Sequence, residues 1–276
     1  MEIGITKMNR TEKNEKAIRA IGLHGRSDAL ARVAAQVREF HHAPARVLVY
    51  GEIGTGKDEV VEALLKKFHG NVELSVIEGR IYENEPEGFI GAYHGGNEIY
   101  QPFPALRGAR VDPSRTFRPA FIEIRDLQKI HSVNQSILGN VFDEDASVSP
   151  KIKVIASARW SFYEGFLKGE VPASFFLGFD LRIRMPRLCE RFEDFALLVP
   201  FLLERIHTTS GNKRDFTPEA IEHLKRYPWP GNSRELSAVL FELVSKNQKA
   251  KVHPAEVSIL LEGWRTKQGL SSWQMK

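Results

Sequence analysis

The stretch Val47-Leu-Val-Tyr-Gly-Glu-Ile-Gly-Thr-Gly-Lys-Asp-Glu-Val-Val61 decides the fold of this chain. It begins with a short apolar, β-branched run at residues 47–50, which predicts a buried strand. Three glycines follow within six residues, and Lys57 then precedes apolar positions that recur at helical spacing. A strand, a glycine-rich loop, a lysine and a helix in this order predict a phosphate-binding loop.

Gly51, Gly56 and Lys57 fit the pattern G-x-x-x-x-G-K-[ST], while Asp58 replaces the hydroxyl residue that normally touches magnesium. The glycines let backbone N–H groups point at phosphate oxygens, and the helix start adds its own free N–H groups. Lys57 supplies a point charge for the β- and γ-phosphates. The alternative is a glycine-rich turn with an exposed lysine, but the context favours nucleotide binding. The predicted ATP- or ADP-binding residues are Gly51, Glu52, Ile53, Gly54, Thr55, Gly56, Lys57 and Asp58.

The composition is that of an ordinary globular protein. The 276 residues are 42% hydrophobic and 27% charged, enough for one large domain or for a larger and a smaller one. The net charge of +4 does not by itself argue for nucleic acid. A single cysteine, Cys189, excludes an intrachain disulfide and fits a reducing compartment. With no apolar run of about 18 residues and no signal-peptide core, we expect a cytoplasmic protein that does not span a membrane.

Strands alternate with helical patterns in the first two thirds of the chain, which predicts a parallel α/β sheet covered on both faces. The segment 79–118, rich in Gly, Pro and aromatic residues, is expected to hold a short helix and an inserted loop. From Glu190 onward the pattern is helical only, with Thr217 as a predicted cap. The strands are expected at residues 47–50, 72–77, 119–125, 152–157 and 181–185. Helices are expected at residues 58–68, ended by Gly70, and at 127–141.

The domain organisation follows from these patterns. The polar segment 1–20 predicts a flexible tail. We expect an α/β nucleotide-binding domain at residues 21–186, a helical lid at 187–263 and a short C-terminal tail at 264–276.

Several motifs resemble one protein family. The loop at residues 51–58 looks like the GESGTGKE loop of bacterial enhancer-binding proteins, the AAA+ activators of sigma-54 RNA polymerase, which themselves carry an acid after the lysine. Trp229-Pro-Gly-Asn-Ser-Arg-Glu-Leu236 is similar to their WPGNVREL motif, and Leu188-Cys-Glu-Arg-Phe-Glu-Asp194 to LRERREDI. Gly25-Arg-Ser27 resembles the motif at the start of their AAA+ region.

The resemblance runs from about residue 21 to 262 and implies an AAA+ P-loop NTPase fold. That fold is a doubly wound α/β domain with a C-terminal helical lid, usually assembled as a ring with nucleotide between subunits. The resemblance also gives Arg234 the role of the lid arginine that contacts the γ-phosphate.

The second acidic motif departs from the family. There a strand ends in Asp-Glu, where Asp orients Mg²⁺ and Glu activates the attacking water. The strand at 121–125 places Glu123 at the Asp position and Ile124 at the Glu position. Glu123 is therefore the predicted Mg²⁺ ligand, and the water-activating acid is missing. A register shifted through Asp126 is the alternative, and we expect it to put Arg125 in the sheet interior.

Other family features are also replaced. Ala158 and Arg159 stand in place of the polar Thr-Asn sensor, and Val171 and Leu177 in place of the two arginines that reach the next subunit. Residues 89–110 occupy the place of the GAFTGA loop that touches the sigma factor. No DNA-binding helix-turn-helix is expected after the lid motif.

These observations leave three hypotheses. The first is an ATP-binding module with weak or no hydrolysis, which acts by assembling into a ring or with a related AAA+ protein. The second is an active ATPase that remodels a macromolecular partner, with catalytic groups from atypical residues or from another subunit. The third is an interaction scaffold that no longer binds nucleotide, and the intact loop argues against it.

Overall fold

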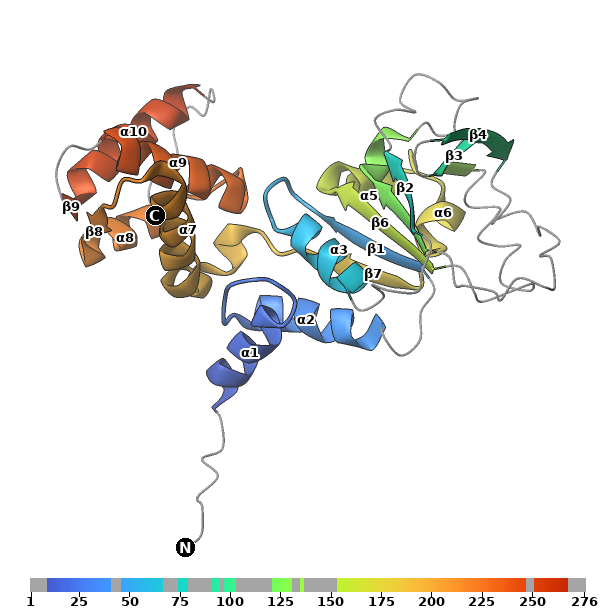
Figure 1. Ribbon diagram of the computed structural model, residues 1–276, viewed down its shortest axis with the longest axis horizontal. Coiled ribbons are helices and arrows are strands. Elements are labelled where there is room, and N and C mark those ends of the chain that lie inside the picture. The colour runs from blue at the N-terminus through green and yellow to red at the C-terminus, as the bar shows by residue number, and fades with distance from the viewer. Residues whose placement is uncertain are drawn as a thin grey trace, which may run out of the picture. The chain divides into compact units, whose positions relative to one another are not determined.

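The computed structural model (Figure 1) describes most of the chain. The described residues divide into two compact units. We call Met1–Arg32, Ile53–Gly56 and Pro186–Lys276 the lid unit, and Val33–Glu52 and Lys57–Met185 the sheet unit. The described residues are 9–40, 46–66, 74–78, 91–94, 97–102, 121–130, 135–136, 153–246 and 251–267.

The sheet unit is built on a five-stranded parallel sheet. Its order, β2-β5-β6-β1-β7, places β1 between β6 and β7, which both follow it much later in the sequence. All five predicted strands are confirmed. Their bounds are β1 Arg46–Gly51, β2 Leu74–Glu78, β5 Phe121–Arg125, β6 Lys153–Arg159 and β7 Leu181–Arg184.

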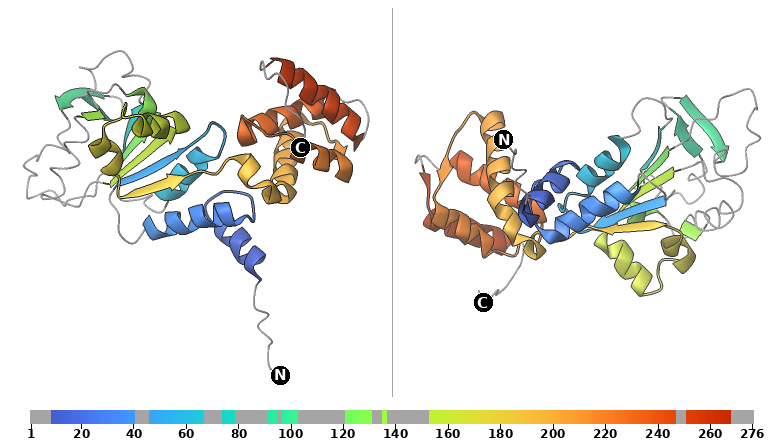
Figure 2. Two further views of the ribbon diagram at one scale, coloured as in Figure 1. Left: turned by 180° about the vertical axis from the view of Figure 1, so that it is seen from behind. Right: turned by 90° about the horizontal axis from the view of Figure 1, so that it is seen from below.

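Helices cover both faces of this sheet, as predicted (Figure 2). On one face lies α3, Lys57–Lys66, which buries Val60, Val61 and Leu64. On the other face lie α5, Trp160–Leu167, and α6, Ala173–Leu177. Side chains of alternate strand residues form the core under α5 and α6, because successive residues of a strand face opposite sides. This core includes Leu48, Ile124, Val154, Ala156, Phe162 and Phe175.

Two parts of the sheet unit differ from the predictions. Where a short helix and a loop were expected at 79–118, the described residues form an antiparallel hairpin of β3, Gly91–His94, and β4, Asn97–Pro102. The expected helix at 127–141 begins as a 3-10 turn, η3, Leu127–Lys129. Most of its remainder lies outside the described residues, as does the predicted helix end at Gly70.

The lid unit is mainly helical. Thr217 caps α8 as predicted, since its side chain accepts a hydrogen bond from the N–H of Ala220, and Pro218 stands in the first turn. The helices enclose their own apolar core around Leu198, Trp229 and Leu240. The helix α10 continues past residue 263, where a tail was expected. The bounds are α7 Phe195–Ser210, α8 Pro218–Lys225, α9 Asn232–Lys246 and α10 Pro254–Lys267, with short paired strands β8 Asp215–Phe216 and β9 Lys251–Val252.

The structure corrects the prediction of a flexible tail at residues 1–20 over residues 10–19, while residues 1–8 lie outside the described residues. Residues Arg10–Arg19 form a helix, α1, that precedes α2, Asp28–Phe40. Asn9 and Glu12 make a reciprocal capping box at its start, and Ile18 is fully buried. The high polarity of the segment concealed this helix, because one buried apolar residue gives no periodic pattern. Across the described ranges, no helix combines the length and apolar character that crossing a membrane requires.

Candidate functional site: the glycine loop and the strand ends

The loop between β1 and α3 needs glycine at two positions. Gly54 and Gly56 have φ values of +74° and +97°, in the left-handed region that side-chain-bearing residues rarely adopt. A Cβ on Gly54 would collide with the carbonyl oxygen of Gly231 and lie 2.9 Å from Cβ of Arg234. The structure therefore brings two predicted site residues, Gly54 and Arg234, into contact.

Three consecutive carbonyls of this loop, at residues 53–55, accept hydrogen bonds from other residues of the lid unit. The Asn232 side-chain amide donates to the carbonyl of Ile53 (2.9 Å), the backbone N–H of Ser233 to that of Gly54 (3.0 Å), and the Arg191 guanidinium to that of Thr55 (3.0 Å). The C=O and N–H of one trans peptide point in opposite directions. The N–H group of each of these peptides therefore points away from the group that holds its carbonyl. A cradle for an anion requires N–H groups turned in this way.

Lys57 is the first residue of α3, and its side chain folds back onto the loop. The ammonium donates to the carbonyls of Gly51 (3.1 Å) and Glu52 (2.7 Å). Phosphate oxygens compete for the same donors, since an anion binds an ammonium more strongly than a neutral carbonyl does. Asp58 lies exposed in the first turn of α3.

The turn that starts α9 contacts loop residues 53 and 54 within the lid unit. Trp229 is buried and donates its indole N–H to the carbonyl of Leu224 (2.9 Å), so its role is structural. Asn232 is fully buried with a φ of +53°, and its side-chain oxygen accepts from the N–H of Leu188 (2.7 Å). The Trp-Pro-Gly-Asn turn thus joins the loop and the 3-10 turn η4, Leu188–Glu190. Arg234 is exposed in the first turn of α9.

The register of β5 changes the assignment of its acidic motif. Glu123 pairs with Ile155 of β6, two residues before β5 ends, and is only 4% exposed. The strand ends with Arg125, whose guanidinium contacts both carboxylate oxygens of Glu123, Nε–Oε1 at 2.6 Å and Nη2–Oε2 at 3.2 Å. Glu123 and Arg125 share one face because they are two residues apart in a strand. The structure gives Glu123 a guanidinium partner where a metal ion was predicted.

Asp126 lies directly after the end of β5. Its side chain accepts from the amide of Gln128 (2.9 Å), whose own oxygen accepts from the backbone N–H of Arg159 (2.8 Å). Arg159 ends β6 and pairs in register with Gly51. Arg159 thus lies at the same end of the sheet as the start of the glycine loop. Asp126 is linked to Arg159 through Gln128.

This arrangement supports the alternative register through Asp126. The expectation that this register would put Arg125 in the sheet interior is wrong, because the Arg125 side chain is 50% exposed. Ile124, predicted to stand at the water-activating position, is instead a core residue on the opposite face of β5.

Val171 and Leu177, which the resemblance puts in place of the family's intersubunit arginines, occupy different environments. Val171 is buried in the core beneath α5 and α6. Leu177 ends α6 and is 58% exposed, an unusual exposure for a large apolar side chain. The structure therefore places one of these positions in the core and the other at the surface.

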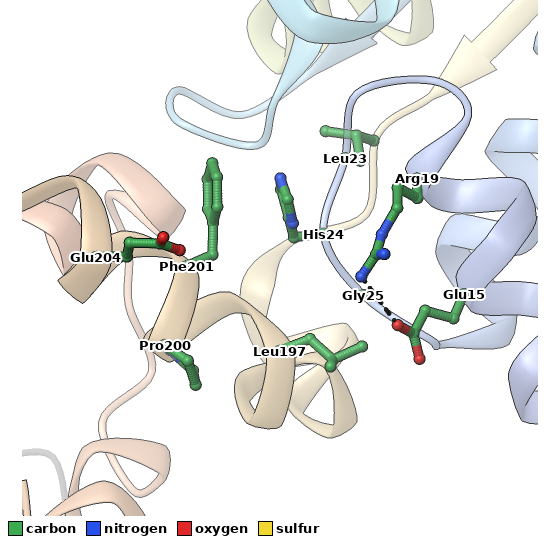
Figure 3. Close-up of a pocket in the computed structure, with 9 residues that line it drawn as sticks. All are labelled: Glu15, Arg19, Leu23, His24, Gly25, Leu197, Pro200, Phe201 and Glu204. Carbon is green, nitrogen blue, oxygen red and sulfur yellow. Dashed lines mark hydrogen bonds and ion pairs between the residues drawn. The ribbon is translucent and has the colours of Figure 1, made fainter.

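A cavity of about 240 Å³ in the lid unit was not found from the sequence (Figure 3). It lies between residues 23–25 and α7, and the ring of His24 stacks on that of Phe201 with centroids 3.5 Å apart. Burial lowers the pKa of His24, and the positive charges of Arg19 and Arg205 lower it further. The cavity could not be found from the sequence, because residues 23–25 and α7 are distant in sequence and no spacing pattern connects them.

Next to this cavity, Asp194 explains two of the sequence motifs. Its carboxylate is fully buried and accepts from the N–H groups of Arg26 and Ser27 (both 2.7 Å) and from the Ser27 hydroxyl (2.8 Å). A Cβ at Gly25 would lie 2.6 Å from Cγ of Asp194. The motif at residues 25–27 and the acid before α7 are thus parts of one clamp.

The comparisons with known proteins agree with this architecture. The chain matches the sigma-54 interaction domain over residues 23–77 and the AAA+ ATPase lid domain over residues 189–269. It is 25% identical over 256 residues to the transcriptional regulatory protein GlrR of Escherichia coli K12, covering 87% of this chain and 56% of that one. It is 24% identical over 231 residues to the Nif-specific regulatory protein of Enterobacter agglomerans, covering 78% and 43%. The chain thus spans about half the length of these relatives.

A solved structure of NtrX from Brucella abortus in complex with ATP superposes with a TM-score of 0.64 at 17% identity, covering 89% of this chain and 57% of that one. The fold is therefore that of an AAA+ P-loop NTPase with a C-terminal lid. Within this class, the predicted resemblance to the AAA+ domain of sigma-54-dependent transcriptional activators is confirmed.

Proposed function

We propose that this chain is an ATP-binding AAA+ module that acts through nucleotide-dependent assembly, with a copy of itself in a ring or with a related AAA+ protein, and with weak or no hydrolysis. The observation that carries the proposal is the loop at residues 51–58. The loop keeps its two left-handed glycines, and the Lys57 ammonium is held by two carbonyls that phosphate oxygens can replace. The ATP bound in the related NtrX structure supports the choice of nucleotide.

Within this proposal the residues have distinct roles. The backbone of residues 51–58 and the Lys57 side chain bind the phosphates. Arg234, in contact with Gly54, approaches the γ-phosphate from the start of α9. Weak hydrolysis is proposed because neither Val171 nor Leu177 carries the charge that an arginine finger supplies. The names of the relatives support a setting in transcription regulation.

Isothermal titration with ATP tests the proposal. The wild-type chain should give a saturable binding heat, and Lys57→Ala should abolish it because the charge on the phosphates is lost. Lys66→Ala is the matched control, since Lys66 ends the same helix in an exposed pair with Glu62. Absent heat in the wild type, or equal heat in wild type and Lys57→Ala, would reject ATP binding at this loop.

A second candidate, an active ATPase that remodels a macromolecular partner, is favoured by the position of Asp126. Its carboxylate follows the end of β5 and is linked through Gln128 to the end of β6. A carboxylate at such a strand end is suited to accept a proton from an attacking water. Phosphate release well above background, lost in Asp126→Asn with ATP binding retained, would favour this candidate. Equal, low release from both proteins favours the assembly module.

A further inference from the structure

The end of β5 carries a positive side chain where a magnesium-dependent site needs a negative one. Mg²⁺ at nucleotide sites is held by one or two carboxylates together with the phosphates. The last residue of β5 is Arg125, and its guanidinium covers the only carboxylate on β5, that of Glu123. The two groups form a bidentate pair, which is the geometry in which arginine binds a carboxylate most strongly.

Glu123 does not fit the role of a magnesium ligand. Its side chain is 6% exposed, and both of its oxygens contact the guanidinium. Coordination of a metal would have to displace the guanidinium from the carboxylate oxygens that the bidentate pair already occupies. A divalent ion placed there would also lie next to a fixed positive charge. Among the described residues, no group of three or more His, Cys, Asp or Glu side chains is arranged to hold a metal ion.

The same end of the sheet holds other cations. Arg159 ends β6 and is exposed, and Lys57 begins the helix that follows β1 through the glycine loop. Together with the half-exposed guanidinium of Arg125, these residues place three cationic side chains at the carboxyl ends of β1, β5 and β6, and one of them, Arg125, is paired with Glu123. The remaining carboxylate after β5, that of Asp126, accepts a hydrogen bond from Gln128.

We propose that Arg125, held by Glu123, takes the place of Mg²⁺, so that this chain binds ATP without a metal ion. The inference rests on the proposed function and deepens it. Glu123 acts as a positioning residue that fixes the guanidinium, and the guanidinium neutralises the phosphates beside Lys57. The nucleotide recognised is then free ATP, and its magnesium complex gains nothing from the metal.

The test is the binding of ATP to the full chain, measured by titration calorimetry in excess magnesium and in excess EDTA. The dissociation constant should differ by less than about twofold between the two conditions. In Arg125→Gln, binding in EDTA should weaken by about tenfold, and magnesium should restore part of the loss because Glu123 is released for the metal. Arg125→Lys should fall between the two, since it keeps the charge and loses the bidentate fork.

Arg46→Gln is the matched control, because Arg46 also pairs with a carboxylate, that of Asp180, but at the opposite end of β1. It should bind ATP as the wild type does in both conditions. Thermal melts establish whether each variant is folded. If Arg125→Gln is unfolded, the comparison of wild-type ATP binding in magnesium and in EDTA still tests whether binding needs a metal ion.

The outcomes separate this inference from the proposed function. Binding in magnesium that disappears in EDTA overturns the inference and leaves ATP binding intact. Absence of binding in both conditions overturns both. If wild type and Arg125→Gln bind ATP with the same affinity in magnesium and in EDTA, Arg125 does not replace the metal ion, and this result also overturns the inference.

Discussion

At the scale of single residues, the Asp194 carboxylate connects two segments of the lid unit that are distant in sequence. Three donors from Arg26 and Ser27 converge on its fully buried carboxylate. A charged acceptor in this position also holds the N-terminus of α2, because the Ser27 hydroxyl in turn accepts from the N–H of Leu30 (3.2 Å). The Asp194 side chain therefore holds residues 26 and 27, the segment that leads into α2.

We predict that Asp194→Ala lowers the free energy of unfolding by about 3 kcal/mol, because two backbone N–H groups lose a charged acceptor inside the protein. Urea denaturation measures the change. Glu193→Ala is the control, since the neighbouring Glu193 is exposed, and it should change stability by less than about 0.5 kcal/mol. Equal changes in the two variants would mean that the clamp does not stabilise the fold.

His24 predicts a dependence of stability on pH. Its pKa is lowered in the folded protein, first by burial and then by Arg19 and Arg205, so the unfolded chain binds the proton more readily. Stability from this group is fully present above the ordinary pKa of 6.5 and is lost as the pH falls from there through the lowered value.

Chemical denaturation at a series of pH values tests this dependence. His24→Gln should flatten the fall in stability on the acid side of neutrality, and His253→Gln, at an exposed position, should leave it unchanged. If the profile of His24→Gln has the wild-type slope, another group is responsible.

At the scale of elements, the turn at the start of α9 depends both on a left-handed backbone conformation and on side-chain hydrogen bonds. Asn232 is in the left-handed region, and its side chain holds both Ile53 and Leu188. Asparagine is one of the few residues that enters this region at low cost. The turn is thus specified by backbone conformation and by side-chain chemistry together.

Two substitutions separate these contributions. Asn232→Gly and Asn232→Ala both lose the side-chain hydrogen bonds, but only alanine adds left-handed strain, of about 1 kcal/mol. We therefore expect both variants to be less stable than the wild type in urea and the alanine variant to be the less stable of the two. An alanine variant at least as stable as the glycine variant would show that strain at this turn is unimportant.

The elements also show what the sequence could and could not predict. The five strands and the lid helices were found because apolar periodicity and capping residues are local signals. The register of β5 stayed open between two alternatives, because register depends on pairing with β2 and β6 and not on the strand's own pattern. The helix α1 was missed for a related reason, since its only buried residue is Ile18. The Glu123–Arg125 pair and the Asp194 clamp likewise depend on geometry that spacing alone does not give.

At the scale of the whole molecule, the proposed assembly requires that the sheet unit has a surface that contacts the next subunit. An AAA+ ring brings the finger positions of one subunit to the nucleotide of the next, and here the surface position is the apolar Leu177. With 58% of this residue exposed at the end of α6, and Leu167 at the end of α5 64% exposed, this unit displays apolar area that a neighbouring subunit would cover.

The corresponding prediction is that ATP increases the sedimentation coefficient of the wild-type chain and that Leu177→Asp prevents the increase. A carboxylate at an apolar contact is desolvated without a partner, which opposes association. The same variant should keep its binding heat for ATP, because Leu177 does not belong to the loop at residues 51–58. Ile259→Asp, at a position 74% exposed on α10 of the lid unit, is the control and should assemble as the wild type does. Assembly of Leu177→Asp at the wild-type ATP concentration would exclude this surface from the contact between subunits.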